Sequence, residues 1–278
     1  MPPNGFEVIH PAIEMVSKFL SSRREGLSPR TIEFYEGYLR RAKNVIGFNV
    51  TNEDIIEFIK SRPCSSGGKH AYYRTLKAFY NWLYSPKSSY KVRAGENPML
   101  GVDAPKEEKK ILPSLTLEQV DSLIEQAGCV RDKAIISLFA DSGLRLAELT
   151  NISPHNIDWA NRLIKVRCKG SKEGLALFGT RTEFLLKEWL NEYSANGRLW
   201  DLKYEGVSDM IQRLSAKTGI AFTAHTLRRT FASILAKRGV DCLHIMRLGR
   251  WESLDMVERY TRSVRFEDSM KFYTAIVS

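Results

Sequence analysis

Two short motifs in the C-terminal half carry residue types that suit phosphoryl transfer. His225 and Arg228 form an H-x-x-R pattern, and Tyr260 follows Trp251 by nine residues. An arginine holds two phosphate oxygens at once through its planar guanidinium, and it stays charged at physiological pH. A tyrosine hydroxyl can attack phosphorus and keep the phosphate as a covalent ester. This stretch therefore predicts chemistry on a phosphate, with Tyr260 as the nucleophile.

Further cationic residues lie upstream of these motifs. The segment SGLRLAEL holds Arg145 and Glu148, whose spacing places them on one face of a helix. The turn KGSKEG holds Lys169 and Lys172, and both are candidates for a lysine that protonates a leaving oxygen. Lysine suits this task because its pKa falls beside other cations. A nucleophile, a clamp for oxygens and an acid are the parts that phosphoryl transfer requires.

The elements that must position these residues are mostly helical. Thr116 begins a capping box, T-x-x-Q, and Gly143 allows a turn between two helices. The apolar periodicity predicts helices over 116–127, 131–140, 180–193, 207–218, 226–237, 242–248 and 254–260. One exception is a β-hairpin, in which Ile164 and Val166 alternate with polar residues and Leu175 and Leu177 repeat at the same two-residue spacing.

The first hundred residues predict four short helices without a catalytic cluster. One of them, from Lys69 to Tyr84, is dense in aromatic residues. These rings would form either a platform for stacked bases or the core of a small bundle, and we favour the core. Basic residues lie on the expected outer faces of this helix, which favours a binding module: Lys69, His70, Arg74 and Lys77. Residues 85–115 hold four prolines and many charges and predict a linker.

The composition and net charge indicate which kind of partner and which compartment suit the protein. The net charge is +10, shared evenly between residues 1–104 and 105–278, which suits a polyanion held from two sides. No apolar run is long enough for a membrane span, and the N-terminus lacks the features of a signal peptide. The four cysteines are far apart and form no C-x-x-C pair. We therefore expect a cytoplasmic protein without a metal site or disulfides.

Together, SGLRLAEL, HTLRR and the Trp251–Tyr260 spacing resemble the tyrosine recombinase (phage integrase) family. The resemblance implies a mainly α fold with a small antiparallel β-hairpin or sheet. It further implies a helical, SAM-like core-binding domain over residues 1–100 and a linker over 101–114. An α+β catalytic domain with a C-terminal tail would occupy residues 115–278.

The same resemblance implies a role for each candidate residue. Tyr260 would form a 3′-phosphotyrosyl bond with DNA and free a 5′-hydroxyl. Lys169, which falls where the family places its lysine, would protonate that leaving oxygen. The remaining positions imply an oxyanion clamp of Arg145 and Arg228, proton transfer by His225, a hydrogen bond from Trp251 to the phosphate, and support from Glu148. The resemblance implies neither metal nor ATP.

Three positions depart from the family pattern. Arg250 stands between Gly249 and Trp251, where the family often has Leu-Gly-His. Cys168 replaces a glycine before the lysine, and Gly174 stands where an arginine often follows the turn. None of these changes removes a catalytic group. We expect direct DNA contacts from Lys69, Arg74, Lys77, Lys172 and Arg250.

The resemblance implies a site-specific DNA recombinase that acts on double-stranded DNA as a tetramer, with an accessory directionality factor as a further possible partner. Two other classes share parts of the pattern: a type IB topoisomerase and a non-catalytic DNA-binding protein. The choice between integration and chromosome-dimer resolution stays open. The apolar tail, RFEDSMKFYTAIVS, would dock on a neighbouring protomer or fold back on its own core. Tyr193 and Tyr273 are rival nucleophiles, but neither follows the L-G-x-W pattern.

Overall fold

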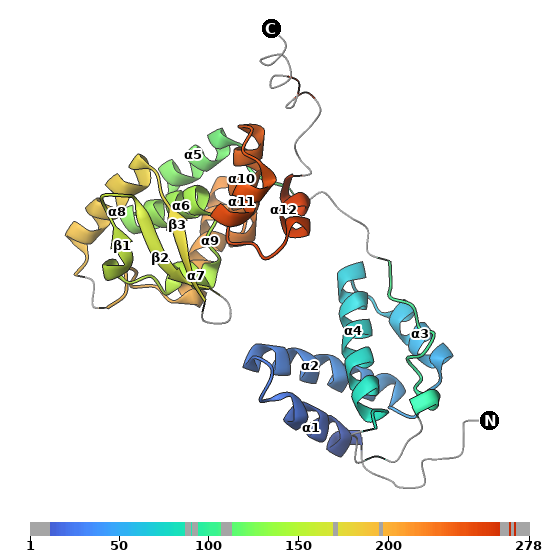
Figure 1. Ribbon diagram of the computed structural model, residues 1–278. Coiled ribbons are helices and arrows are strands. Elements are labelled where there is room, and N and C mark those ends of the chain that lie inside the picture. The colour runs from blue at the N-terminus through green and yellow to red at the C-terminus, as the bar shows by residue number, and fades with distance from the viewer. Residues whose placement is uncertain are drawn as a thin grey trace. The chain divides into compact units, whose positions relative to one another are not determined.

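Two units, each with its own core, make up the chain, and they comprise residues 1–109 and 110–278 (Figure 1). The structure, a computed structural model, describes residues 12–86, 90, 94–106, 113–168, 172–194, 197–261, 267 and 270. Lys169, Tyr273 and nearly all of the C-terminal tail lie outside the described residues. The predictions that concern them therefore stay predictions.

In its described residues, the first unit contains four α-helices. Ser28 and Thr51 accept backbone N–H groups at the starts of the second and third helices, as N-cap residues do. The elements are α1 Ala12–Arg23, α2 Pro29–Ile46, α3 Asn52–Ser61, α4 Ser66–Leu83 and the 3-10 turn η1 Ala94–Glu96. The fourth helix begins three residues earlier than its apolar pattern predicts, because Ser65 caps it.

The aromatic side chains of α4 form the core of the first unit. Tyr72, Tyr73, Phe79 and Tyr80 are all buried, and Phe79 packs edge-on against Phe19 of α1. These rings are therefore unavailable to stack on bases, and the preferred interpretation of this helix as a core helix is confirmed.

The second unit surrounds helix α6. Its helices are α5 Leu117–Gln126, α6 Val130–Ser142, α7 Leu146–Thr150, α8 Thr180–Glu192, α9 Tyr204–Thr218, α10 Ala224–Lys237, α11 Cys242–Leu248 and α12 Leu254–Thr261, with the 3-10 turn η2 Pro154–Asn156. Helices α5, α8 and α10 pack against α6, which carries the fully buried Ile135, Ile136 and Phe139. A mainly helical chain with a small antiparallel sheet is the fold class that the sequence predicts, and it is confirmed.

The sheet contains three antiparallel strands in the order β1 Ile157–Asp158, β2 Leu163–Arg167 and β3 Glu173–Leu177. The short β1 was not expected. In β3, Leu175 and Leu177 are 55% and 44% exposed while Ala176 is buried, so the two leucines lie on the outward face. Register explains this, because Ala176 lies opposite the buried Ile164. A small residue fits there, where the sheet meets the core.

A separate apolar cluster joins α10, α11 and α12. Its buried members are Phe231, Ala232, Ile245, Trp251 and Val257, and Tyr260 packs against them. This cluster sets where Tyr260 lies relative to α10, which carries His225 and Arg228. Among the helices that the structure describes, none has the length and apolar content needed to cross a lipid bilayer.

Candidate active site

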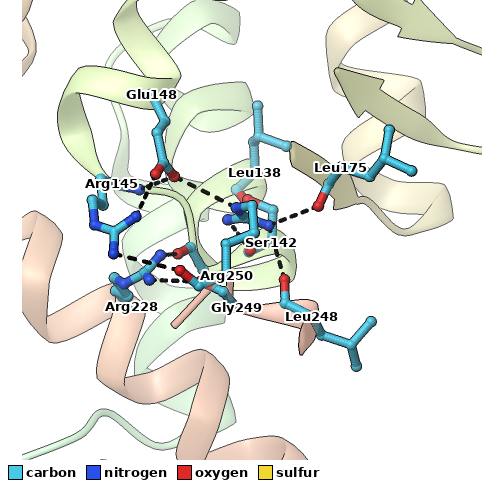
Figure 2. Close-up of polar contacts among 10 residues, drawn as sticks. Leu138, Ser142, Arg145, Glu148, Leu175, Arg228, Leu248, Gly249 and Arg250 are labelled. Atoms are coloured by element: carbon cyan, nitrogen blue, oxygen red, sulfur yellow. Dashed lines mark hydrogen bonds and ion pairs between the residues drawn. The ribbon is translucent and has the colours of Figure 1, made fainter. Parts of the chain in front are cut away.

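The turn between α6 and α7 places Arg145. Gly143 ends α6 in the left-handed conformation, and a Cβ there would lie 2.5 Å from the ring of Phe231. Arg145 follows as the N-cap of α7, and its Nη1 lies 2.6 Å from Glu148 Oε1. The second carboxylate oxygen of Glu148 accepts the Arg145 backbone N–H at 3.0 Å. Glu148 thus fixes both the backbone and the guanidinium of Arg145 (Figure 2).

Arg228 enters the same site from the second turn of α10. It is 3% exposed. Its Nη1 donates to the carbonyl of Gly143, and its Nη2 donates to the carbonyl of Gly249 at 2.6 Å. Its guanidinium carbon lies 4.3 Å from the centre of the Trp251 ring, close enough for a cation–π contact. Arg228 therefore joins the end of α6 to the turn after α11 (Figure 2).

The turn after α11 brings Trp251 onto Arg228. Gly249 ends the helix, and a Cβ at this position would overlap the Trp251 ring. The Trp251 ring also lies 5.4 Å from the Tyr260 ring, centre to centre. Trp251 therefore contacts Arg228 through a cation–π contact and Tyr260 through a tilted ring contact, which links the arginine to the proposed nucleophile. This explains the L-G-x-W pattern physically, because only glycine leaves room for the indole.

The indole N–H of Trp251 points into the protein. Trp251 is 5% exposed, and its Nε1 is buried with no hydrogen-bond partner among the described residues. The sequence predicts that this N–H donates to a phosphate. In this structure the ring contacts Arg228 and Tyr260, and donation from its N–H to a phosphate stays a prediction.

His225 lies at the rim of a cavity of about 180 Å³ that Arg145 and Arg228 also line. Partial burial lowers the pKa of its imidazole, and the nearby charges of Arg229, Arg228 and Arg145 lower it further. His225 is therefore neutral at pH 7 and can accept a proton.

Positive charge exceeds negative charge in this site. Burial and the neighbouring Arg145 lower the pKa of Arg228 to about 9. Burial opposes ionisation of Glu148, but the hydrogen bonds from Arg145 and the nearby Arg250 outweigh it, so the pKa of Glu148 is lowered. Three guanidinium groups thus share one carboxylate. Such a cluster favours an anion with several oxygens, such as a phosphodiester.

Arg250 is largely buried beside Glu148. Its side chain is 8% exposed, and it donates to the carbonyls of Ser142, Leu175 and Leu248. These donors face the protein's own carbonyls, and the contact of Arg250 with DNA stays a prediction. The two hairpin lysines differ, since Lys172 is exposed and Lys169 lies outside the described residues.

The three basic residues expected to contact DNA from α4 are partly engaged within the first unit. Lys69 Nζ donates to the carbonyl of Lys60 at 2.6 Å, and Lys77 Nζ to the hydroxyl of Tyr73 at 3.0 Å. Arg74 is exposed, with its guanidinium 5.9 Å from the ring of Phe34. Their role in binding DNA stays a prediction.

A comparison with known protein families shows to which family the chain belongs. Residues 113–265 match the sequence profile of the phage integrase family. The chain belongs to this family. The match contains Arg145, Glu148, His225, Arg228 and Tyr260, so the residues of the site lie within the shared domain.

Named relatives of this chain are tyrosine recombinases. The chain is 32% identical over 161 residues to tyrosine recombinase XerA of Saccharolobus solfataricus, an alignment that covers 58% of this chain and 55% of XerA. The chain thus spans about half the length of that relative. It is 27% identical to tyrosine recombinase XerC of Pelobacter propionicus, over 95% of both chains. The chain therefore shares its family with proteins named as tyrosine recombinases.

A solved structure shows the same fold. The structure of XerH site-specific recombinase, bound to a palindromic difH substrate after cleavage, matches 96% of this chain and 84% of that one. The TM-score is 0.73 at 19% identity. At this identity the match supports the fold of a tyrosine recombinase and carries no residue roles.

Proposed function

We propose that this phage integrase family member is a site-specific DNA recombinase whose nucleophile is Tyr260. The observation that carries the proposal is that Trp251 contacts both Arg228 and Tyr260 beside Arg145. It brings a phosphate clamp and a hydroxyl nucleophile to neighbouring positions. The XerH structure, which holds its DNA substrate after cleavage, supports double-stranded DNA as the partner.

The proposed reaction proceeds in two balanced steps. The Tyr260 oxygen attacks phosphorus, its proton passes to neutral His225, and the bond from phosphorus to the 5′ oxygen breaks. Lys169 gives that oxygen a proton, while Arg145 and Arg228 balance the charge on the non-bridging oxygens. The 5′-hydroxyl of a partner strand then attacks the phosphorus of the 3′-phosphotyrosyl ester and gives its proton to Lys169. The bond from phosphorus to the Tyr260 oxygen breaks, and His225 returns a proton to the tyrosine. One phosphodiester replaces another, so the reaction is close to isoenergetic.

The two units would divide the work. The first, as a core-binding domain over residues 1–100, would hold DNA through basic residues such as Arg74, and residues 115–278 would perform catalysis. Affinity that depends on phosphate contacts falls as the salt concentration rises. Strand exchange joins two duplexes, and the proposal therefore includes a tetramer on DNA. The proposal also includes a directionality factor as an accessory partner and a cytoplasmic location for the protein.

A covalent-capture experiment tests the proposal and recovers the target sequence at the same time. The full chain is incubated, without metal or ATP, with a pool of random duplexes that carry nicks. Adducts that survive denaturation are isolated and sequenced. We expect an adduct with the wild type and none with Tyr260→Phe. The matched control is Tyr193→Phe, because Tyr193 stacks on Trp189 at 4.7 Å and serves packing; it should keep the adduct.

The outcomes separate the candidate functions. An adduct that persists in Tyr260→Phe would assign the nucleophile to another residue. Sequence-selective DNA binding without any adduct would favour a non-catalytic DNA-binding protein. Relaxation of a supercoiled plasmid that lacks the recovered sequence would favour a topoisomerase. Exchange of strands between two duplexes that both carry the sequence would support the recombinase.

A further inference from the structure

The backbone after α11 takes a conformation that glycine usually adopts, and here an arginine occupies it. Arg250 has a φ of 56°, and in the described part of the chain only Arg162 shares a positive φ among non-glycine residues. Trp251 N donates to Met246 O at 3.0 Å, and Arg250 N donates to Arg247 O at 3.1 Å. These two bonds define a Schellman motif, in which the left-handed position is commonly glycine. An arginine at this position points to a function for its side chain.

The Arg250 guanidinium connects three separate elements. Nη1 donates to the carbonyls of Leu248 at 2.8 Å and of Leu175 in β3 at 3.0 Å. Nη2 donates to the carbonyl of Ser142, the last residue of α6, at 3.1 Å. Nε lies 3.6 Å from Glu148 Oε2, a separation that permits an ion pair. The side chain therefore anchors the turn to the hairpin, to α6 and to α7 (Figure 2).

The turn that Arg250 anchors also holds both arginines of the proposed clamp. The carbonyl of Gly249 accepts Arg228 Nη2 at 2.6 Å, and the carbonyl of Arg250 accepts Arg145 Nη2 at 3.5 Å. The direction of these two carbonyls depends on the backbone conformation of the turn. Whatever fixes the turn therefore also fixes where the two guanidinium groups point.

The hairpin leaves space for this side chain. A Cβ at Gly174 would lie 2.8 Å from Arg250 Cδ and 2.8 Å from Cys168 Sγ. Any larger residue at this position would displace the arginine. Gly174, which has no side chain, therefore leaves the space that the Arg250 side chain fills.

We propose that Arg250 is a positioning residue that orients Arg145 and Arg228 toward the scissile phosphate by locking the left-handed turn. This inference rests on the proposed function, because it concerns the same site. Arg250 does not touch the substrate. Its effect passes through the carbonyls of Gly249 and Arg250 and through Glu148.

The test compares two glycine substitutions. Arg250→Gly keeps a residue that accepts the left-handed backbone but removes the anchor. Arg162→Gly is the matched control, since it makes the same change at the other positive φ, where the side chain is 44% exposed. Single-turnover adduct formation is measured on the nicked duplex recovered by covalent capture. The scissile group is either a phosphate or a methylphosphonate, which is uncharged and depends less on cations.

We expect Arg250→Gly to slow cleavage of the phosphate by about 10- to 100-fold, as small misplacements of catalytic groups do. The loss on the methylphosphonate should be several-fold smaller. Arg162→Gly should match the wild type on both substrates. An equal loss on both substrates would overturn the proposal, as would unchanged cleavage. A substrate with sulfur at the 5′ leaving position provides one more test. If it restores the cleavage rate of Arg250→Gly, Arg250 acts on the leaving group and the proposal is overturned.

Two further measurements test the inference even where Arg250→Gly does not fold or the proposed function is wrong. Arg250→Lys retains a charge but not the planar fork, so it should give a smaller defect of the same kind if Arg250→Gly fails to fold. Arginine side-chain N–H signals in NMR spectra report the clamp directly. We expect separate, slowly exchanging Nη–H signals for Arg228 in the wild type that collapse in Arg250→Gly. If the wild type forms no adduct, the proposed function fails, and unchanged Arg228 signals would separately reject the positioning role.

Discussion

The guanidinium of Arg228 lies over the indole of Trp251, with 4.3 Å between its carbon and the ring centre. In the described part of the chain, two of its N–H groups donate to the carbonyls of Gly143 and Gly249. A guanidinium carries five N–H donors. Arg228 can therefore be held by the protein and still donate to a phosphate.

Replacing Arg228 with lysine should abolish most of the cleavage activity. An ammonium cannot hold the carbonyls of Gly143 and Gly249 and also form a planar pair with phosphate oxygens. We expect Arg228→Lys to reduce the single-turnover cleavage rate by about 10²- to 10³-fold, the usual effect of removing one oxyanion donor. A loss below tenfold would show that Arg228 does not contact the phosphate.

Substitutions of Trp251 separate packing from hydrogen bonding. Because Nε1 has no partner among the described residues, Trp251→Phe should keep most of the stability and most of the cleavage rate. Trp251→Ala removes the ring from Arg228 and Tyr260 and should lower the free energy of unfolding by about 3–5 kcal/mol. Denaturant melts and adduct assays check both variants. A large rate loss in a stably folded Trp251→Phe would instead support donation from the indole to DNA.

Glu148 should make the stability depend on acidic pH. Its folded pKa is lowered, so its contribution to stability is present above the ordinary pKa of a glutamate and is lost as the pH falls through the lowered value. Glu148→Gln removes this contribution and leaves Arg145 and Arg250 without their counter-charge. Breaking such a buried pair destabilises a protein by about 3–5 kcal/mol. Thermal melts between pH 7 and pH 3 should show a steeper fall for the wild type than for Glu148→Gln.

The pKa of His225 predicts the acid limit of the cleavage reaction. The pKa is lowered, so the imidazole stays neutral below the ordinary titration range of histidine, near pH 6.5. If His225 takes the proton of Tyr260, the cleavage rate should hold as the pH falls through 6.5 and decline only below it. The pH profile of the single-turnover rate measures this limit. An acid limb above pH 6.5 would contradict the assignment.

Gly249 should not tolerate any side chain. A Cβ there would overlap the Trp251 ring, so Gly249→Ala must displace the ring from Arg228. Overpacking of this kind lowers stability by about 1–3 kcal/mol, and we expect a loss of cleavage with it. Gly128→Ala is the control, because a Cβ at Gly128 meets nothing within 4 Å. Equal stability of the two variants would show that the Trp251 ring can move without consequence.

The sequence by itself determined the helices, the family and the residue types of the site. Caps such as Thr116 and apolar periodicity give local signals, and these predicted the second unit almost helix by helix. The motifs around Arg145, His225 and Tyr260 are short and ordered, so they identify the chemistry without coordinates. The residue preference for Lys169 over Lys172 also came from sequence, and it stays a prediction.

Only the tertiary structure decided the burial and partners of Arg250, the burial of the Trp251 N–H and the buried face of β3. An arginine beside catalytic residues suggests a DNA contact, but its partners here are backbone carbonyls from Ser142 and Leu175. Every residue has a carbonyl, so no side-chain pattern reveals which ones converge on a guanidinium. The β3 face was similarly hidden, because two large leucines alternate with small residues and only the pairing with β2 shows that the small residues face the core.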